Sequence, residues 1–287
     1  MTAENGTAAR LVVQAADIAT PALKALAKLA GAERIDAMSR SADQAFALTP
    51  VSDTATVAAY CAQAAIDCAL VPPGQRLDRV RLVAMDMDST LISIECVDEI
   101  ADMMGIKQEV AAITASAMRG EIDFGQSLTR RVALLRGLDV AALQRVYDER
   151  LKLSPGAERL LAGMRAVGAQ SLLVSGGFTF FTERLKARLG IDHTCANTLE
   201  IADGRLTGRL IGPIVDAEAK AACFGRLRAK LATQGGLAVA IGDGANDLPM
   251  LKAADISVAY HAKPVVRAGA TYAIDYCGLD AILNLFE

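Results

Sequence analysis

The chain has 287 residues, a formal net charge of −3 and 53% hydrophobic residues, which predicts a globular protein of one large or two smaller domains. Lysine and arginine are spread along the whole chain, so nothing resembles the basic patch of a nucleic-acid-binding protein. No run approaches the roughly 20 apolar residues of a membrane span, and the N-terminal MTAENGTAAR lacks the layout of a signal peptide. We therefore expect a cytoplasmic protein without nucleic-acid or membrane partners.

Residues 1–75 have the pattern of a small α+β domain. The order strand, helix, strand, strand, helix, strand is that of ferredoxin-like folds. Residues 72–78 (PPGQRLD) have the composition of a linker. Apolar runs and turn residues predict strands at 10–15, 35–40, 44–50 and 67–72 and helices at 21–30 and 54–66.

From residue 79 the pattern changes to that of an α/β domain. The stretch RLVAMDMD begins as an unbroken apolar run, which is typical of a strand covered on both faces in a parallel sheet. Similar strands are expected at 170–177 and 237–244, and a weaker one at 255–260, with helices between them. The predicted fold class is therefore α/β, with a Rossmann-like parallel sheet core formed by residues 79–96 and 154–287.

Residues 97–153 interrupt this alternation, because they contain helical patterns and no convincing strand. They are expected to form a helical cap inserted in the core. A second exception is the stretch 195–211, where two strand-like runs flank Asp203-Gly204 and predict a hairpin. The inserted helices are expected at 96–105, 107–120, 124–137 and 141–151.

The supply of metal-binding and nucleophilic residues limits the possible chemistry. The cysteines stand far apart without a CxxC pair, which favours reduced, buried thiols over a disulfide framework or a zinc site. His193 and His261 are the two histidines, so histidine-based metal or triad chemistry is disfavoured. The chemistry is expected to rest on carboxylates, lysine and backbone amides. The six cysteines are Cys61, Cys68, Cys96, Cys195, Cys223 and Cys277.

Three of the predicted strands end in polar turns, MDMDST, SGGF and GDGANDLP. Ligands bind beyond the carboxyl ends of the strands in open parallel sheets, so the three turns are expected to share one crevice. Asp86 and Asp88 lie two residues apart at a strand end and point to the same side. Adjacent carboxylates repel each other unless a cation is present, and Mg²⁺ with its oxygen ligands meets that need. A solvated turn is the alternative explanation for this pair taken alone.

The other two turns and one lysine supply further candidates. Asp243 lies one glycine beyond its strand and offers a third carboxylate to the same ion, although a tight turn with Asp247 as helix cap is the alternative. Ser175 and the amides that follow it predict a phosphate cradle or an ordinary helix cap. Lys220 begins a predicted helix near the same crevice and can hold a phosphate oxygen, although most lysines on helices are solvated.

These elements, in this order, resemble the signature of the haloacid dehalogenase-like phosphatases. Asp86 and Asp88 match the DxDxT motif, with Thr90 in its last place. Ser175 matches the second motif, Lys220 the third and GDGAND the fourth. The resemblance covers about residues 80–260, and the predicted helical insertion is similar to the cap of the family.

The resemblance implies a role for each matched residue. Asp86 would be the nucleophile that forms an aspartyl-phosphate, and Asp88 the general acid and base. The implied cofactor is Mg²⁺, held by Asp86, Asp243 and the backbone carbonyl of Asp88. The phosphate would be held by Ser175, Gly176, Lys220 and Asn246.

A longer signature is similar to the branch of this family that hydrolyses O-phosphoserine to serine and phosphate, the last step of serine biosynthesis. It includes MDMDSTLISIE and AMRGEIDFGQSLTRRVALL. By this similarity Glu95 would contact the substrate ammonium group and Arg131 its carboxylate, while Met118 and Phe124 would close over the substrate. Taken alone, Glu95 could be a first-turn glutamate favoured by the helix dipole, and Arg131 a solvated surface arginine.

The first 75 residues resemble the ACT-like domains of some bacterial relatives, on the strength of strand order alone. This resemblance implies an amino-acid-binding regulatory domain or the interface of a homodimer.

Two other functions stay open for the core. One is a related phosphatase or phosphotransferase that acts on phosphothreonine or phosphohomoserine. The other is a receiver-type phospho-acceptor, which also uses a strand-end aspartate with magnesium but does not need the cap or GDGAND.

Overall fold

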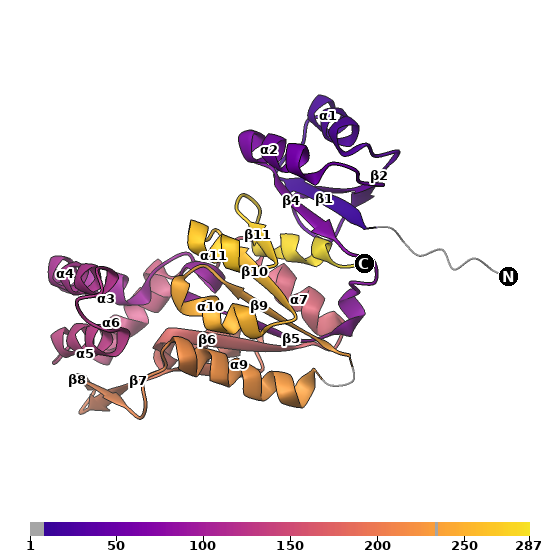
Figure 1. Cartoon of the computed structure of the whole chain (residues 1–287). Helices are drawn as coiled ribbons and strands as arrows, with labels where there is room; N and C mark the ends of the chain where they lie inside the picture. Colours follow the sequence, from indigo (N-terminus) through magenta and orange to yellow (C-terminus); the bar gives the residue numbers. More distant parts are fainter. Residues whose placement is uncertain (1–8, 233–234) are drawn as a thin grey trace.

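The structure is a computed structural model that describes residues 9–232 and 235–287. It has an N-terminal α+β domain, an α/β core and a group of helices inserted in the core. Figure 1 shows the N-terminal domain above the core, beside the C-terminus, and the inserted helices at the left end of the core. Within the described ranges, no helix has the length and apolar character needed to cross a membrane.

The N-terminal domain is a four-stranded antiparallel sheet with two helices, in the strand order β2-β3-β1-β4. This confirms the predicted ferredoxin-like order. Pro21 lies in the first turn of α1, and Gly31 ends that helix in the left-handed conformation. The Asp53 side chain caps α2 by accepting the Thr56 N–H. The elements are β1 (Arg10–Ala15), α1 (Thr20–Ala30), β2 (Arg34–Met38), β3 (Gln44–Thr49), α2 (Thr54–Ala64) and β4 (Asp67–Val71).

The core is a seven-stranded sheet in the order β11-β10-β9-β5-β6-β7-β8. β5 pairs in parallel with β6 on one side and with β9 on the other, so the carboxyl ends of these three strands are adjacent. MDMDST and GDGANDLP begin at the last residues of β5 and β9, whereas SGGF forms the last four residues of β6. The four predicted strands are confirmed, and the three-residue β11 was too short to predict. The strands are β5 (Val80–Met85), β6 (Gln170–Phe178), β7 (His193–Ala202), β8 (Arg205–Ile211), β9 (Leu237–Gly242), β10 (Ile256–Tyr260) and β11 (Tyr272–Ile274).

Helices cover both faces of this sheet, as the unbroken apolar runs predicted. Leu82 of β5 packs in one cluster with Phe224, whereas Val83 packs in another with Leu160, and all four are 0% exposed. Full burial of a side chain of this kind stabilises the fold by about 1.5–3 kcal/mol. One layer contains α9 (Ala217–Leu231), α10 (Leu248–Ala253) and α11 (Pro264–Gly269), and the other contains α7 (Ala157–Ala166), α8 (Thr179–Leu189) and the 3₁₀ helix η5 (Leu279–Leu285).

The inserted helices leave the core and return to it at one point. An antiparallel bridge joins Ile92 to Leu153, and the Ser154 N–H donates to the Leu91 carbonyl at 2.9 Å. The division of the chain at residues 97 and 153 stays a prediction, and it falls close to this bridge. The helices are α3 (Cys96–Met104), α4 (Lys107–Met118), α5 (Phe124–Leu134), α6 (Val140–Arg145) and a π-helical turn η3 (Val146–Arg150).

The predicted hairpin is present as β7 and β8, with Asp203 and Gly204 at positive φ in its turn. It supports the inserted helices, a contact that the sequence did not predict. Leu206 of β8 donates to the Leu138 carbonyl at 2.8 Å and accepts from the Gly137 N–H at 2.8 Å. Figure 1 shows the hairpin beneath α5 and α6.

The prediction that all cysteines are reduced was wrong for one pair. A disulfide bond joins Cys195 on β7 to Cys223 on α9, whose Cα atoms are 6.8 Å apart. The 28-residue separation carries no motif, so the pairing follows from the packing of α9 on the sheet and not from a spacing in the sequence. The other cysteines are free; Cys61, Cys96 and Cys277 are buried and Cys68 is half-buried.

The N-terminal domain is bonded to the last segment of the chain. Asp67, which is 4% exposed, accepts the backbone N–H groups of Asp275, Tyr276 and Cys277 at 2.7, 3.1 and 2.9 Å. Asn284 of η5 completes the junction by donating to Gln14 and Ser41. One carboxylate thus satisfies three N–H groups, and Asp67 is one of several residues that hold the domain on the core.

We expect Asp67→Ala to lower the free energy of unfolding by about 3 kcal/mol, because three N–H groups lose their acceptor in a place that water reaches poorly. Urea unfolding followed by far-UV circular dichroism measures the loss. Asp36→Ala is the control, since Asp36 lies on the exposed strand β2 and, within residues 9–232 and 235–287, pairs only with Arg34 at the surface. Equal unfolding midpoints for the two variants would show that the junction is not held by Asp67.

Candidate active site

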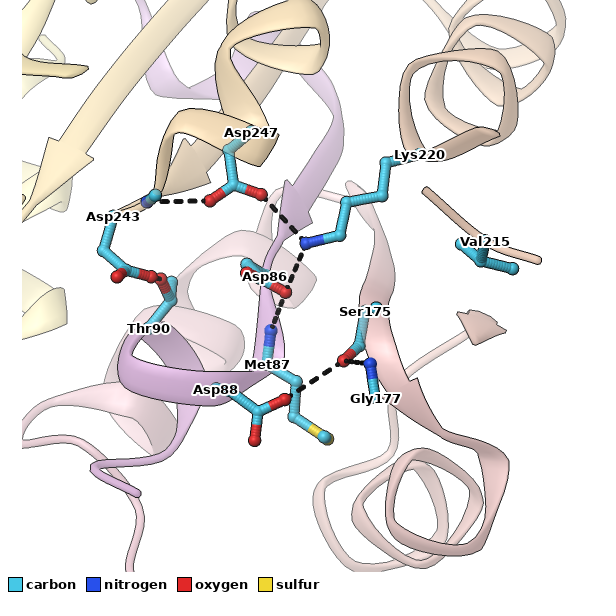
Figure 2. A network of polar contacts seen from close by, with 12 residues as sticks. Asp86, Met87, Asp88, Thr90, Ser175, Gly177, Val215, Lys220, Asp243 and Asp247 are labelled. Atoms are coloured by element: carbon cyan, nitrogen blue, oxygen red, sulfur yellow. Dashed lines mark hydrogen bonds and ion pairs between the residues drawn. The ribbon is translucent and has the colours of Figure 1, made fainter. Parts of the chain in front are cut away.

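β5 delivers Asp86 to the centre of the site. The Asp86 N–H still bonds to Ile241 of β9 at 3.1 Å, and the chain then turns through the π-helical segment η2 (Met87–Leu91). Ser89 takes φ +57° in this turn, a left-handed conformation that is costly for a residue other than glycine. The turn separates the two aspartates of MDMDST, so that their carboxylates have different partners (Figure 2).

Lys220 lies between Asp86 and Asp247, as Figure 2 shows. Its Nζ is 2.8 Å from Oδ1 of Asp86 and 3.0 Å from Oδ1 of Asp247, and its side chain is 1% exposed. Burial opposes the charge of Lys220, but the two carboxylates outweigh it and raise the pKa of the ammonium group. A charged lysine therefore lies beside Asp86; burial raises the pKa of Asp86, and the charge of Lys220 opposes this rise.

Asp243 and Asp247 follow β9, in the turn before α10 and its 3₁₀ start η4 (Ala245–Asp247). The Thr90 hydroxyl donates to Oδ1 of Asp243 at 2.8 Å, so the last residue of the DxDxT motif holds the third carboxylate. Asp247 is fully buried and accepts the Gly244 N–H at 3.1 Å. A Cβ on Gly242 would lie 2.6 Å from the Asp247 carboxyl group, so the glycine is needed for this close approach.

Three carboxylates form a group that fits a metal ion. Oxygen atoms of Asp86, Asp243 and Asp247 all lie within 4.8 Å of one another. Burial raises the pKa of Asp243, and the bond from Thr90 opposes this rise. A hard divalent cation takes oxygen ligands at such a spacing and removes the repulsion between the carboxylates. The Asp88 carboxylate lies outside this group, which leaves its backbone carbonyl as the predicted ligand.

Asp88 has an environment suited to proton transfer. Its Oδ1 accepts the Cys96 N–H at 2.8 Å, and its Oδ2 accepts the Ser175 hydroxyl at 3.3 Å. Burial raises the pKa of Asp88, and the bonds from Cys96 and Ser175 oppose this rise. A carboxyl group with a raised pKa can carry a proton and give it up during a reaction.

Ser175 is fully buried at the end of β6 and accepts the Gly177 N–H at 2.8 Å. The structure thus places it between Asp88 and the glycine amides, on the side of Asp86 opposite Asp243 (Figure 2). A Cβ on Gly176 would lie 3.0 Å from Cζ of Phe124, so this glycine leaves room for the aromatic ring above the cradle. Phe124 itself begins α5 and is 36% exposed.

Glu95 and Arg131 contribute opposite charges near the aspartates. Glu95 is exposed and accepts the Ser89 hydroxyl at 2.7 Å. Desolvation by nearby protein atoms and the charge of Asp88 nevertheless raise the pKa of Glu95 to about 7. Burial lowers the pKa of Arg131, and the charges of Asp98, Glu95 and Asp88 oppose this effect. The Arg131 Nε is buried without a hydrogen-bond partner among the described residues, so this guanidinium is available to a ligand.

Two residues predicted to touch the substrate are exposed in this structure. Met118 ends α4 and is 74% exposed, and no contact to the aspartates is recorded among the described residues. Asn246 is also exposed, although it lies in η4 next to Asp247. Their roles in substrate binding stay predictions, since both depend on a bound substrate.

The sequence missed two residues of the site. Asp247 was considered only as a helix cap, but its side chain binds Lys220 and the Gly244 amide instead of capping α10. Asn197 is 2% exposed on β7 and joins the cradle to the loop before α9, because it donates to the Gly176 carbonyl at 2.8 Å and accepts the Val215 N–H at 2.8 Å. A single asparagine within a predicted strand gave little sign of this, whereas Asp247 in GDGAND was a visible candidate.

Comparisons with known proteins identify the family of the chain. Residues 83–252 match the sequence model of the haloacid dehalogenase-like hydrolases, and residues 219–286 match a second model of the same description. The chain therefore belongs to the haloacid dehalogenase-like hydrolase family. Residues 11–59 match a model described only as a domain of unknown function, so an ACT relationship of the N-terminal domain has no support from this comparison.

Individual relatives within the family are more specific. The chain is 54% identical over 220 residues to the phosphoserine phosphatase of a Polaromonas strain, which covers 75% of this chain and 93% of the relative. A crystal structure of a probable phosphoserine phosphatase from Vibrio cholerae is 33% identical, with a TM-score of 0.85 over 99% of this chain and 88% of that one. A haloacid dehalogenase-family hydrolase from Salmonella enterica serovar Typhi is 34% identical, with a TM-score of 0.85 over 97% of this chain and 98% of that one.

Proposed function

We propose that this protein is a phosphoserine phosphatase, which hydrolyses O-phosphoserine to serine and phosphate through an aspartyl-phosphate on Asp86. The observation that carries this proposal is the arrangement around Asp86, with Lys220 at 2.8 Å on one side and the protonatable Asp88 on the other. The identity of 43–54% to several curated phosphoserine phosphatases supports the choice of substrate.

Asp86 performs the first step of the proposed reaction. A carboxylate oxygen of Asp86 attacks the phosphorus atom, the bond from phosphorus to the serine oxygen breaks, and an acyl phosphate forms. Lys220, Ser175 and the Gly176 amide bind the phosphate oxygens and so stabilise the charge that develops on them. Asn246 contributes to the position of the phosphoryl group.

Asp88 moves the protons in both steps. Protonated at the start, it gives its proton to the departing serine oxygen, which avoids the release of an alkoxide. The resulting carboxylate then takes a proton from the water molecule that attacks the phosphorus of the aspartyl-phosphate. The second attack releases phosphate and regenerates Asp86. The bonds to Cys96 and Ser175 hold Asp88 in place for both transfers.

The proposed metal ion is Mg²⁺, which Asp86, Asp243 and the backbone carbonyl of Asp88 would hold. The nearby carboxylate of Asp247 adds negative charge beside it. When bound, Mg²⁺ neutralises phosphate charge and orients the group.

Initial rates with a panel of small phosphomonoesters test this function. We expect O-phosphoserine to have the highest kcat/KM, and removal of divalent cations with EDTA to lower the rate roughly 100-fold or more until Mg²⁺ is added back.

The panel also separates the alternatives. Higher kcat/KM with phosphothreonine or phosphohomoserine would assign the protein to a related phosphatase. Transfer of the phosphoryl group to added homoserine in preference to water would make it a phosphotransferase. A single phosphorylation without sustained phosphate release would indicate a receiver-type acceptor.

Glu95 and Arg131 are proposed to select phosphoserine among phosphomonoesters. Glu95 pairs with the substrate ammonium group, and Arg131 grips the carboxylate through parallel hydrogen bonds. Met118 and Phe124, at the facing ends of α4 and α5, are proposed to close over the substrate and exclude water.

The raised pKa of Glu95 predicts a pH dependence that is specific to phosphoserine. Below pH 7 Glu95 is increasingly neutral and loses its attraction for the ammonium group, so kcat/KM for phosphoserine falls as the pH decreases. A cation beside Asp88 and Asp243 offsets the charges that raise this pKa, so the midpoint in the metal-loaded enzyme lies at or below pH 7.

The measurement is the ratio of kcat/KM for phosphoserine to that for 3-phosphoglycerate, which carries a hydroxyl group in place of the ammonium group. Taking the ratio cancels the effect of pH on the substrate phosphate and on Asp88, because the reactions of both substrates depend on these groups in the same way. In Glu95→Gln the ratio is expected to be low and independent of pH. A ratio that does not vary with pH in the unmodified protein would contradict the pairing of Glu95 with the ammonium group.

The ACT-like character of the N-terminal domain and a homodimer formed through it stay predictions. Sedimentation of the full chain with and without serine tests both together. A dimer whose stability depends on serine would support a regulatory domain, and a monomer unaffected by serine would oppose it.

A further inference from the structure

A cavity lies between the N-terminal domain and the core, next to the active-site turn. Its volume is about 470 Å³, within the range of about 300–1,000 Å³ in which small-molecule sites fall, and domain interfaces commonly carry such sites. Its walls come from the loop before β3, the ends of β10 and β11, and the segment that follows the inserted helices. Of the site residues described above, Ser89 alone lines it, so the cavity is a separate space beside the active site.

Two carboxylates from opposite sides of the domain interface line this cavity. Asp43 of the N-terminal domain accepts the Gly278 N–H at 3.1 Å, and Asp280 of the core accepts the Ala42 N–H at 2.7 Å. These reciprocal bonds fix both carboxylates in place. Arg159 lies 3.3 Å from Asp280 and offsets its charge, but no arginine or lysine is among the residues that line the cavity. Asp43 is therefore left as the principal charge facing the cavity.

Aromatic rings contribute to the remaining wall, although Tyr260 itself is only 3% exposed. Tyr260 and His261 lie edge to face with ring centroids 4.3 Å apart, and Tyr276 lines the same space with 47% of its surface exposed. Burial raises the pKa of Tyr260 to about 12; a bond with Ser154 opposes this rise, and the charges of Asp280 and Asp43 add to it. Carboxylates combined with aromatic faces are the surroundings that organic ammonium ions prefer.

We propose that this cavity is a second binding site, specific for a small organic amine in its ammonium form. Asp43 pairs with the ammonium group, and the half-exposed ring of Tyr276 covers the attached carbon chain. A free amino acid fits this lining less well, because its carboxylate would meet Asp43 and Asp280 without a basic side chain to bind it. The two sites therefore differ in charge: the cavity offers carboxylates alone, whereas the proposed substrate site combines the carboxylate of Glu95 with the guanidinium of Arg131.

Calorimetric titration of the full chain with 1,4-diaminobutane, and separately with serine, tests the proposal. We expect the diamine to bind more tightly than serine, and Asp43→Asn to weaken its binding tenfold or more. Glu95→Gln is expected to leave that binding unchanged. Asp36→Asn, on the exposed strand β2 of the same domain, serves as the matched control and is also expected to leave it unchanged.

The opposite pattern overturns the proposal. Loss of diamine binding in Glu95→Gln with retention in Asp43→Asn would place the amine in the substrate site. Equal affinity for the diamine in Asp43→Asn and Asp36→Asn would show that binding depends on general surface charge and not on Asp43. No measurable binding of the diamine to the unmodified protein would show that the cavity does not take the proposed ligand. Should Asp43→Asn disturb the domain interface, Tyr276→Ala removes a half-exposed ring from the wall instead and is expected to weaken the diamine in the same way. These titrations involve no phosphate release, so their outcome is independent of the proposed phosphatase activity.

Discussion

Replacing Asp86 with asparagine is expected to abolish phosphoserine hydrolysis, with a loss of roughly 10⁴-fold or more, as for the removal of other catalytic nucleophiles. An amide oxygen is a poor nucleophile and cannot form the acyl phosphate. The fold is expected to persist, because the change is isosteric and Lys220 keeps Asp247 as a partner at 3.0 Å. Steady-state phosphate release from the purified, magnesium-loaded variant measures the effect.

The matched control is Asp255→Asn. Asp255 lies at the opposite end of the sheet, where it accepts the N–H of Ala238 at the start of β9 and pairs with Arg228. Its replacement tests whether the loss of an aspartate near the sheet is enough to reduce activity, and near-normal turnover is expected. Mass spectrometry of the unmodified protein, quenched during turnover, should detect phosphate on Asp86. Substantial activity in pure Asp86→Asn would exclude this residue as the nucleophile.

Arg131→Ala is expected to reduce kcat/KM for phosphoserine by roughly 30-fold or more while phosphoethanolamine, which has no carboxylate, is much less affected. Loss of one partner of a buried charge pair costs about 2–5 kcal/mol, and each 1.4 kcal/mol corresponds to about a factor of ten. The unpartnered Nε of Arg131 is the structural reason to expect that this guanidinium binds the substrate and does not merely stabilise the inserted helices.

The neighbouring residue provides the control for this experiment. Arg130 lies on the same helix, α5, and is exposed, so Arg130→Ala removes the same charge one residue away without reaching the site. We expect Arg130→Ala to change kcat/KM by no more than about twofold with either substrate, because salt screens the effect of an exposed charge. Equal losses for phosphoserine and phosphoethanolamine in Arg131→Ala would reject carboxylate recognition by this residue.

The parts of the site that could be predicted are those in which the backbone brings the side chains together. Asp86 and Asp243 each follow a strand, Ser175 lies near the end of another, and parallel strands that neighbour one another end at the same edge of the sheet. The ferredoxin-like order of the N-terminal domain was predictable for a similar reason, because the alternation of elements within 62 residues (Arg10–Val71) allows few topologies.

The parts that could not be predicted depend on pairs of residues far apart in the sequence. Lys220 and Asp247 are 27 positions apart, and nothing local to either shows that they share a buried ion pair. Cys195 and Cys223 form a disulfide for the same kind of reason, across the packing of a helix on a strand. Asp67 begins a predicted strand and belongs to no motif. Its three partners lie more than 200 residues later, so the sequence around it gives no sign of these bonds.

The junction between Asp67 and residues 275–277 has a consequence for folding. Asn284 bonds to Gln14 across 270 positions, and the three partners of Asp67 lie more than 200 positions after it. Contacts between residues so far apart in sequence form only after the entropy of closing the long intervening segment has been overcome. The N-terminal domain can close its own sheet within residues 10–71, so its docking on the core is expected to be a late step in folding.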